Sequence, residues 1–469
     1  MNKEAPKTLP YKLLKKNADT LTPIGIFKRL HGKKKFLLES SFEHEKKGKY
    51  SYIGSDPYKE VIGRGDMTTV INHDTGEENT FKQKTLQYIK ENLPKIDLDL
   101  PLPFTGGAIG YIGYDAIRQY EDIGVDLPDD LNMPDIHFMI YRNLIIYEHS
   151  NESVHLVAMN IDHQSESVLD KRLELLAEAL HGDLKISDPG KTNVNFKSDM
   201  SEEAFKEKVR VAKEHIHQGD AFQIVVSKRM QAKIDGDPFS YYRKLRIANP
   251  SPYMFYIDFG DYLIVGASPE SLIQTTGRDI VTNPIAGTRA RGITDTEDQL
   301  LMAELLADKK EIAEHQMLVD LSRNDLGQVC EIGSITIPTY MKIEKYQHVM
   351  HIVSEVHGKL NSNLTSIDAL IACLPAGTVS GAPKIRAMQI INELEDTKRG
   401  FYGGGIGYIS FNHDLNMALA IRSLVIKDNY AYLQTGAGIV YDSDVDDEFA
   451  ETLHKARSLM EVSDIDFTY

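Results

Sequence analysis

DKKEIAEHQMLVDLSRNDL, residues 308–326, is the stretch around which we interpret this sequence. It consists largely of strong helix formers, and Gly327 follows as a candidate helix end, so we predict a helix. Glu311, Glu314 and His315 have the spacing that places side chains on one helix face. Taken alone, this face is most simply a solvated acidic surface.

A second predicted helix changes that interpretation. Residues 444–462, DVDDEFAETLHKARSLMEV, also have helical periodicity. Glu448, Glu451 and Lys455 share one of its faces. Mg²⁺ prefers oxygen ligands and keeps several waters that substrate oxygens can replace. Carboxylates that face each other from two helices therefore suggest a Mg²⁺ site.

Composition limits the class of protein. The chain has 469 residues and a net charge of −16, which argues against nucleic acid or an anionic membrane as the main partner. No apolar run is long enough to cross a bilayer, and the amino terminus lacks the apolar segment of a signal peptide. Two cysteines, Cys330 and Cys373, give no disulfide framework, so we expect a reducing, cytoplasmic location.

The first part of the chain alternates predicted strands, helices and turns. The Gly-rich segment TGGAIGYIGY, residues 105–114, indicates a close-packed strand, and its echo at 403–409 suggests similar strands in two related sheets. Polar residues at 181–198 mark a domain boundary, which divides the chain into 1–185 and 200–465. We predict strands at 36–40 and 50–53, and helices at 85–93 and 166–180.

The second part groups strands with helices without strict alternation. This pattern predicts an α+β fold with largely antiparallel sheets and flanking helices. His348 and His351 are assigned to a helix. The predicted helices are 201–219, 237–248 and 296–306, and the predicted strands are 221–233, 253–257, 263–265, 271–274, 280–281, 404–410, 418–426 and 430–434.

Four segments rich in Gly, Ser and Thr are interpreted as turns. Exposed N–H groups in such turns bind carboxylates, and nearby Arg and Lys side chains can offset substrate charge. Together with the two acidic helix faces, they predict a doubly negative substrate with Mg²⁺. The turns are 266–270, 283–292, 376–384 and 435–438, and the candidate cations are Arg289, Arg291, Lys384, Arg422 and Lys455.

The same segments resemble the chorismate-utilising enzymes over residues 200–460. In the first half, LLES at 37–40 and GKYSYIG at 48–54 resemble the large chains of anthranilate synthases and of their relative, aminodeoxychorismate synthase component I. The resemblance implies the chorismate-utilising fold, with two intimately associated lobes. Its motifs are SPE at 268–270, PIAGTRARG at 284–292, DKKEIAEHQMLVDLSRNDLG at 308–327, VMHIVSEVHG at 349–358, PAGTVSGAPK at 375–384, RGFYGGGIGY at 399–408, AIRS at 420–423 and GAGIVYDS at 436–443.

Two positions separate the activities within this family. Isochorismate and salicylate synthases carry a lysine that activates water where this chain has Gln223, and glutamine cannot act as a base. Aminodeoxychorismate synthases usually carry a lysine where this chain has Ala286. The pair resembles the anthranilate synthase pattern, although Ala286 is also explained as a small residue in a tight turn.

The resemblance implies a reaction, in which chorismate and ammonia give anthranilate and pyruvate through 2-amino-2-deoxyisochorismate. This reaction is the first committed step of tryptophan biosynthesis. The implied catalytic residues are Glu270 as general acid, His351 for the later proton loss, and Thr288. The implied Mg²⁺ ligands are Glu314 and Glu451, with Glu311 and Glu448 nearby. Gly287, Thr288, Tyr402 and Arg422 would position the ring, and Gly436, Ala437, Gly438 and Lys455 the enolpyruvyl carboxylate.

Partners and regulation are implied as well. Neither cysteine lies in the GxCxG turn of a glutamine amidotransferase, so a buried structural role is favoured. Ammonia would then come from a separate glutamine amidotransferase subunit, anthranilate synthase component II, in a heterotetramer of two large and two small chains. The 1–185 domain would contact this partner and contribute to a feedback site for tryptophan, and 200–465 would bind chorismate. Ser40, Pro252, Tyr253 and Met254 would line the tryptophan site.

Three alternatives remain open. Aminodeoxychorismate synthase component I shares much of the pattern and differs in its product. A non-catalytic tryptophan or chorismate sensor would be expected to lose some of Glu270, Glu314, His351 and Glu451, and all four are present. An unrelated Mg²⁺ hydrolase is disfavoured by the family-specific segments.

Overall fold

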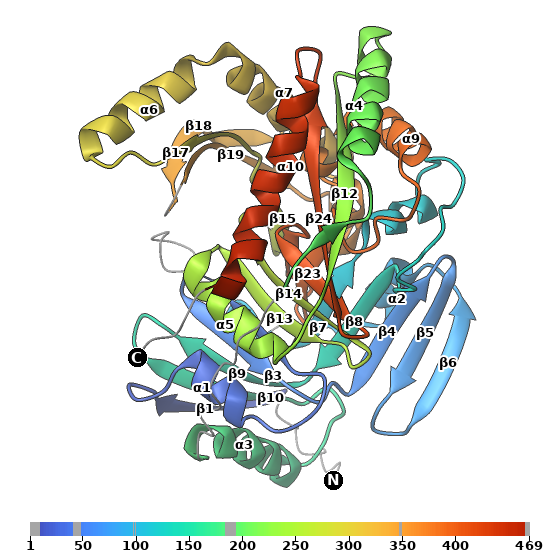
Figure 1. The fold of residues 1–469 in the computed structure, drawn as a ribbon. Coiled ribbons are helices and arrows are strands. Elements are labelled where there is room, and N and C mark those ends of the chain that lie inside the picture. Colours follow the sequence, from blue (N-terminus) through green and yellow to red (C-terminus); the bar gives the residue numbers. More distant parts are fainter. Residues whose placement is uncertain are drawn as a thin grey trace.

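A computed structural model describes residues 10–40, 48–182 and 194–464, except 97, 99, 347 and 348. Within these residues, the strands form two 12-stranded sheets in which every hydrogen-bonded pair between named strands is antiparallel. Helices flank both sheets (Figure 1). The predicted α+β class with antiparallel sheets is confirmed.

The first sheet joins strands from both parts of the chain. In spatial order they are β1 (Tyr11–Asn17), β10 (Ser153–Met159), β9 (Asn143–Glu148), β3 (Tyr50–Gly54), β2 (Phe36–Glu39), β13 (Tyr253–Asp258), β14 (Tyr262–Ser268), β23 (Ser423–Lys427), β24 (Tyr430–Ile439), β12 (Gln223–Lys233) and β11 (Lys197–Ser198), and β20 (Gly381–Ala382) pairs with β12.

The second sheet also contains strands from both parts of the chain. Its order is β17 (Ile285–Ala290), β19 (Val349–Lys359), β16 (Asp279–Thr282), β15 (Ser271–Thr276), β22 (Leu415–Leu419), β21 (Gly405–Ser410), β7 (Gly107–Ile112), β8 (Ile136–Tyr141), β4 (Lys59–Arg64), β5 (Met67–Asn72) and β6 (Glu77–Lys82), and β18 (Thr336–Lys345) pairs with β19. The sequence ranges 1–185 and 200–465 thus share hydrogen-bonded sheets, at β2–β13 and at β7–β21.

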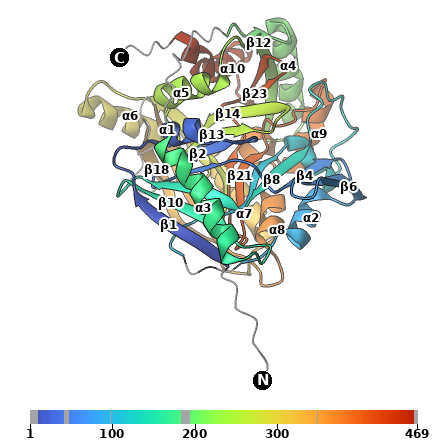
Figure 2. The same ribbon diagram turned by 90° about the horizontal axis from the view of Figure 1, so that it is seen from below.

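The helices cover the sheets. Seven of them match predicted segments, whereas the helices at 23–29, 366–373 and 384–394 were not predicted. Helix α3 lies across β10 and β1 (Figure 2), and α10 packs on β24. The helices are α1 (Pro23–Arg29), α2 (Thr85–Asn92), α3 (Glu166–His181), α4 (Glu202–His217), α5 (Pro238–Ala248), α6 (Asp295–Ala307), α7 (Lys309–Gly327), α8 (Ser366–Cys373), α9 (Lys384–Leu394) and α10 (Val445–Met460), with short 3₁₀ turns η1 (Tyr114–Gln119), η2 (Gly377–Val379) and η3 (Glu461–Asp464).

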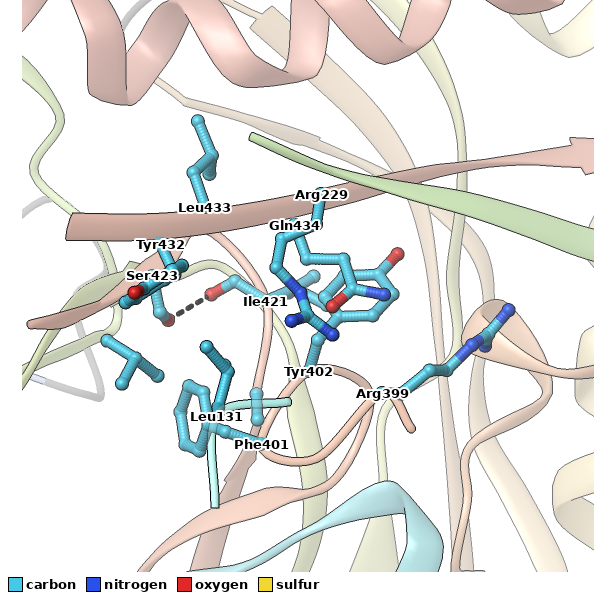
Figure 3. Close-up of a pocket in the computed structure, with 12 residues that line it drawn as sticks. Leu131, Arg229, Arg399, Phe401, Tyr402, Ile421, Ser423, Tyr432, Leu433 and Gln434 are labelled. Carbon is cyan, nitrogen blue, oxygen red and sulfur yellow. Dashed lines mark hydrogen bonds between the residues drawn. The ribbon is translucent and has the colours of Figure 1, made fainter. Parts of the chain in front are cut away.

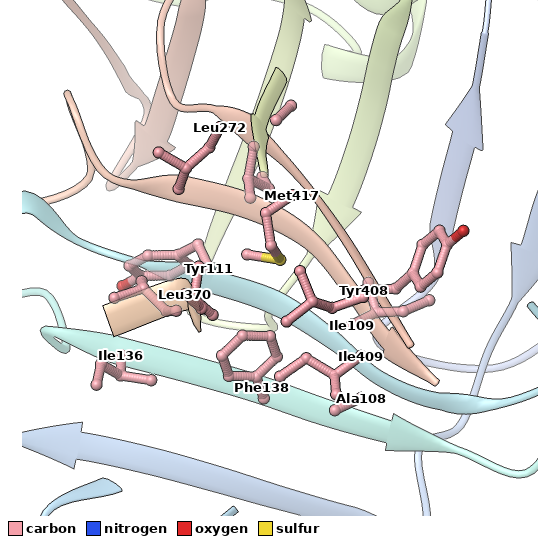
Figure 4. Packing of buried hydrophobic residues seen from close by; sticks show 14 of the residues in the cluster. Ala108, Ile109, Tyr111, Ile136, Phe138, Leu272, Leu370, Tyr408, Ile409 and Met417 are labelled. Atoms are coloured by element: carbon pink, nitrogen blue, oxygen red, sulfur yellow. The ribbon is translucent and has the colours of Figure 1, made fainter. Parts of the chain in front are cut away.

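The glycine-rich echo corresponds to two neighbouring strands. Strands β7 and β21 pair directly, with Gly110 opposite Gly407, so the prediction that they belong to two related sheets is wrong. A Cβ on Gly110 would lie 1.9 Å from the carbonyl oxygen of His137, and one on Gly407 would lie 2.1 Å from that of Asn416. The glycines are needed because backbone from the next strand occupies the side-chain position. Ile109, Phe138, Met417 and their neighbours fill the core around this pair (Figure 4).

Two predicted turns are strands. Residues 285–290 form β17, and 435–438 lie inside β24. The glycines of 435–438 do not mark a turn. They leave room for neighbouring side chains, since a Cβ on Gly436 would lie 2.9 Å from the hydroxyl oxygen of Tyr402.

Three other boundaries differ from the predictions. The predicted strand 418–426 is broken between β22 and β23, where Arg422 has a left-handed backbone with a φ of 51° and the chain passes from the second sheet to the first. His351 lies on β19, where pairing with β17 outweighs local helical spacing, while His348 lies outside the described residues. Gly327 is the last residue of α7, and Gln328 is its C-cap.

A buried charge network connects the two sheets. The carboxylate of Glu60 on β4 is 1% exposed and accepts hydrogen bonds from Lys34 Nζ at 2.9 Å and from His137 Nε2 at 2.8 Å. His137 Nδ1 in turn lies 2.6 Å from the hydroxyl of Tyr262 on β14. Burial opposes ionisation of Glu60, but these donors lower its pKa to about 2.

We predict that Glu60→Gln destabilises the protein by roughly 3–5 kcal/mol at pH 7, the usual cost of breaking a buried ion pair. The pKa of Glu60 is lower in the folded than in the unfolded chain. Its stabilisation is therefore complete above about pH 4.5 and is lost as the pH falls towards 2. Denaturant unfolding from pH 7 to pH 3 should show the difference between wild type and variant shrinking. Glu78→Gln, on the exposed strand β6, is the control and should change stability by less than about 0.5 kcal/mol.

Candidate active site

Helices α7 and α10 begin with the same local device. The Asp308 carboxylate accepts the N–H groups of Lys310 and Glu311, and Asp444 caps α10 in the same way. Such caps satisfy N–H groups that have no partner within the helix. Both helices therefore start at defined residues just before the acidic faces that the sequence indicated.

Three glutamates on these helices are close enough to repel one another. Burial raises the pKa of Glu314 to about 7, Lys310 opposes the shift, and the charges of Glu311, Glu451 and Glu448 add to it. Burial likewise raises the pKa of Glu448 to about 7, with a contribution from Glu451. The structure thus brings Glu314, Glu448 and Glu451 together.

Lys455 favours the charged form of Glu451. Burial disfavours ionisation of Glu451, but the Lys455 ammonium, 2.6 Å away, keeps its pKa below the usual value. Lys455 Nζ also donates to the carbonyl oxygen of Gly436 at 2.9 Å. One cation thereby connects the acidic face of α10 to β24.

The glutamates fit a divalent cation. Glu448 Oε2 is buried and has no hydrogen-bond partner within the described chain, and the neighbouring carboxylates raise each other's energy. Among the same residues, no group of three or more His, Cys, Asp or Glu side chains is arranged to hold a metal by itself. Mg²⁺ needs only one or two carboxylates when waters and substrate oxygens complete its shell. Glu314 and Glu451 are suitable donors for such a site.

Glu311 is oriented towards β17. Its Oε1 accepts a hydrogen bond from Arg289 at 3.1 Å, and Arg289 also contacts Asp308 at 2.8 Å. Arg289 is therefore neutralised by α7 and its cap. Arg291 is similarly paired with Asp298, 2.7 Å away. These two candidate cations have structural partners.

Arg422 lies beside the C-terminal half of α10. Its guanidinium donates to the carbonyl oxygen of Lys455 at 2.7 Å and to the Ser458 hydroxyl at 3.0 Å. Its charge also acts on the ionisation of His351 and Tyr402. Arg422 therefore lies among the predicted substrate residues and is held in place by α10.

The segment before Tyr402 is held by a buried ion pair that the sequence analysis did not assign. Arg399, 3% exposed, donates to both Glu395 oxygens and to the carbonyl oxygens of Val379 and Val225. Burial raises the pKa of Tyr402 to about 12, so its hydroxyl is a neutral donor near Gly436. The only sequence signal for Arg399 was its place in the RGFYGGGIGY segment.

A cavity of about 350 Å³ lies behind Tyr402. In Figure 3, Arg229, Gln434 and Tyr402 gather on one side of it, and Leu131 and Phe401 lie on another. Arg229 is paired with Asp130 at 2.7 Å.

Strands β17 and β19 hold the histidine. Thr288 lies opposite His351, and His351 Nδ1 is 3.0 Å from both Thr288 Oγ1 and the carbonyl oxygen of Gly287. Burial lowers the pKa of His351, so the ring is neutral at pH 7. We assign the Nδ1 proton to the Gly287 carbonyl, which leaves Nε2 as the basic nitrogen.

Glu270 follows β14 and is 9% exposed. Burial raises its pKa to about 7, while the hydrogen bond from Thr378 Oγ1, 2.9 Å from Oε1, and the charge of Lys455 oppose the shift. A carboxyl group with this pKa can donate a proton near neutral pH. Thr378 lies in the predicted turn 376–384, but the sequence did not indicate its contact with Glu270.

The two specificity positions lie on different sheets. Gln223 is the first residue of β12. Its side chain lies against Gly438, where a Cβ would be 2.8 Å from Gln223 Nε2. Its Oε1 is buried and has no hydrogen-bond partner in the described part of the chain. Ala286 lies on β17 opposite Ile352.

The predicted tryptophan residues meet where β2 pairs with β13. Met254 lies opposite Glu39, which places Ser40 and Tyr253 at the same end of the two strands. The Ser40 hydroxyl is buried without a partner among the described residues. Glu39 Oε2 accepts the Tyr242 hydroxyl at 2.7 Å and Arg246 Nε at 2.9 Å.

Comparison with known proteins places this geometry in a family. Residues 33–461 match the model of the chorismate binding enzymes. Anthranilate synthase component 1 of Lactococcus lactis is 44% identical over 95% of this chain and 98% of its own length. These relationships confirm the resemblance drawn from the sequence motifs.

Solved structures agree. Anthranilate synthase component I from Streptococcus pneumoniae superposes with a TM-score of 0.82 at 40% identity, over 95% of this chain and 98% of that one. The menaquinone-specific isochorismate synthase of Escherichia coli gives a TM-score of 0.72 at 17% identity over 98% and 96%, which shows a shared fold. No helix among the described residues is long and apolar enough to span a membrane.

Proposed function

Because this chain belongs to the chorismate-binding enzymes, we propose that it is the large subunit of an anthranilate synthase. It would convert chorismate and ammonia into anthranilate and pyruvate through 2-amino-2-deoxyisochorismate, in tryptophan biosynthesis. Its similarity to anthranilate synthase component 1 along nearly the whole chain supports this assignment. The observation that carries the chemistry is the buried carboxyl of Glu270, whose pKa is about 7.

In the first step, Glu270 acts as general acid. It protonates the C4 hydroxyl of chorismate while ammonia attacks C2, so the hydroxyl leaves as water. Burial keeps a fraction of Glu270 protonated at pH 7, where an ordinary glutamate would be ionised. The Thr378 hydrogen bond orients the carboxyl group.

In the second step, His351 accepts the C2 proton. A neutral imidazole is needed for this, and burial lowers the pKa of His351 accordingly. Its hydrogen bond to the Gly287 carbonyl holds the ring in place. The C2–H electron pair makes the ring aromatic as the C3–O bond breaks, and the departing enolpyruvate takes up a proton to become pyruvate.

The substrate has two carboxylates, and the site offers two kinds of countercharge. Glu314 and Glu451 would hold Mg²⁺, with Glu311 and Glu448 nearby. When bound, the ion would supply positive charge that attracts the ring carboxylate. Gly287, Thr288, Tyr402 and Arg422 would position the ring. Lys455 and the backbone of Gly436, Ala437 and Gly438 would take the enolpyruvyl carboxylate.

The choice of ammonia as nucleophile depends on two positions. Gln223 cannot activate water as a base, although its unpartnered Oε1 can accept a hydrogen bond. Ala286 has no nucleophilic side chain, unlike the lysine expected of an aminodeoxychorismate synthase. That enzyme remains the alternative function, and product identity separates the two. A non-catalytic sensor would not need the tuned acid and base.

We further propose that ammonia comes from a glutamine amidotransferase subunit, in a complex of two large and two small chains. The curated relatives are called component 1, which implies a second component. Burial raises the pKa of both cysteines, to about 11 for Cys330, so neither is a reactive thiolate near neutral pH.

Tryptophan would act as feedback inhibitor at the β2–β13 junction. The buried Ser40 hydroxyl without a partner, and the adjacent Glu39, provide polar groups for an amino acid. Pro252, Tyr253 and Met254 provide apolar surface.

The purified chain with chorismate, Mg²⁺ and an ammonium salt should form anthranilate, measured by its fluorescence. EDTA should abolish the signal, and glutamine should not replace ammonium. Glu451→Gln should lower activity by at least roughly 10²-fold, because the metal organises the substrate. Glu461→Gln, an exposed position after α10, is the control. Consumption of chorismate without anthranilate would indicate an aminodeoxychorismate synthase, and no consumption would favour a sensor.

Glu270→Gln should lower kcat by roughly 10²–10⁴-fold, the usual contribution of a positioned acid. In the wild type at constant free ammonia, kcat should fall as the pH rises through the pKa of Glu270 at about 7, because the acid form is lost. The variant should lack this alkaline decline. An unchanged pH profile would contradict the assignment of Glu270.

Millimolar tryptophan should inhibit the wild type. Ser40→Ala should raise the half-inhibitory tryptophan concentration by roughly fivefold or more, since it leaves a bound polar group unpaired. Thermal stability should stay near that of the wild type, as the Ser40 hydroxyl has no partner among the described residues. Ser167→Ala, exposed on α3, is the control. Activity unaffected by tryptophan would refute the feedback site.

A further inference from the structure

A second cavity, whose empty space of about 400 Å³ includes open solvent, adjoins the proposed acid. Of the residues assigned above to catalysis, substrate or metal, Glu270 alone lines it within the described chain. Its walls come from β15, α7, α8 and the segments 282–284 and 376–378. The polar lining residues are Glu270, Ser271, Thr282, Asn283, Ser322, Asp325 and Thr378.

Two hydroxyl groups of this lining are unsatisfied. Ser271 is 6% exposed and Thr282 is 5% exposed, and neither hydroxyl has a hydrogen-bond partner among the described residues. Buried polar groups almost always have partners, because an unpaired one costs free energy. Two such groups in one polar cavity indicate a site for small hydrogen-bonding molecules.

Two carboxyl groups line the cavity. Glu270 accepts the Thr378 hydroxyl. Asp325 of α7, 7% exposed, is paired with Lys384 at 2.7 Å. The unsatisfied hydroxyls thus line a space that Glu270 and Asp325 share.

We propose that this cavity receives the water released from C4 and returns a proton to Glu270 through the hydroxyls of Ser271 and Thr282. The inference rests on the proposed function and assigns these two residues as positioning residues for the acid. Hydroxyls suit this role because each donates and accepts a hydrogen bond.

Glu270 gives its proton to the C4 oxygen, the C4–O bond breaks with its electron pair on oxygen, and water leaves. Ammonia forms the C2–N bond with its own electron pair, the ring double bonds shift so that their electrons replace the pair lost at C4, and the new nitrogen later releases one proton. Glu270 remains as a carboxylate and must regain a proton before the next turnover.

Several other groups act on Glu270 or lie at the cavity. Lys455 of α10 favours the carboxylate, and the Tyr346 hydroxyl interacts with Glu270 electrostatically. Asp325, which is paired with Lys384 of α9, also lines the cavity. Cys373 of α8 is a further lining residue, and burial raises the pKa of its thiol, so it remains neutral. Exchange with bulk solvent would supply the proton.

The test compares Thr282→Val, Ser271→Ala and the double variant with wild type, using chorismate and an ammonium salt. Thr282→Val keeps the side-chain shape and removes the hydroxyl, whereas Thr282→Ser keeps the hydroxyl. Thr275→Val is the matched control, because Thr275 on β15 is buried outside the cavity and accepts the Leu415 N–H at 3.1 Å. The readouts are kcat, KM, the solvent isotope effect on kcat and the melting temperature.

We expect the double variant to lose roughly tenfold or more in kcat, less than the roughly 10²–10⁴-fold expected for loss of a whole acid. The KM for chorismate should change little, and the solvent isotope effect should increase because proton return becomes rate-limiting. The melting temperature should not fall, since no protein hydrogen bond is lost. Thr282→Ser should retain activity. The Thr275→Val control should lose stability and keep its kcat.

Other outcomes overturn the inference. Wild-type kcat and isotope effect in the double variant would exclude a proton route. A raised KM for ammonia with an unchanged isotope effect would mean that the cavity admits ammonia instead. If the wild type is active and the variants have the same kcat and isotope effect, this inference alone is refuted. If the wild type does not consume chorismate, the proposed function is refuted as well.

Discussion

Repulsion between clustered carboxylates is the constraint on which the rest of this site depends. Glu314 on α7 and the pair Glu448 and Glu451 on α10 are partly removed from water, and burial and mutual repulsion raise the pKa of Glu314 and Glu448 to about 7. Lys455 compensates only Glu451. The arrangement is favourable when another cation is shared between the helices, so the packing of α7 and α10 itself prepares a place for positive charge.

The sheets hold these helices in position. Helix α10 packs on β24, α7 packs on β17 and β19, and each sheet combines strands from both parts of the chain. The close approach at Gly110, Gly407 and Gly436 requires glycine because backbone or a tyrosine hydroxyl occupies the side-chain position. The buried Glu60–His137 pair then connects elements that are distant in sequence. Arg399, which is paired with Glu395 four residues before it, does the same through its hydrogen bond to the carbonyl oxygen of Val225.

Burial also adjusts the proposed acid and base in opposite directions. It raises the pKa of Glu270 and lowers that of His351, so the neutral forms of both are populated near pH 7. A carboxyl can then donate and an imidazole can accept a proton at the same pH. The cavity beside Glu270 adds unsatisfied hydroxyls to this environment, which links the tuning of the acid to its access to protons.

The sequence by itself determined the secondary structure of the long periodic segments. Strong helix formers and helical spacing located α7 and α10, and the family motifs implied one site for Glu314, Glu451, Lys455 and Glu270. Tertiary structure decided what local pattern cannot encode. The TGAG segment, residues 435–438, lies within strand β24 next to Tyr402. His351 lies on β19, and Arg422 has a left-handed backbone. The contacts of Thr378 with Glu270 and of Asp325 with Lys384 could not be predicted from the sequence, because strand pairing and burial depend on residues far away in the chain.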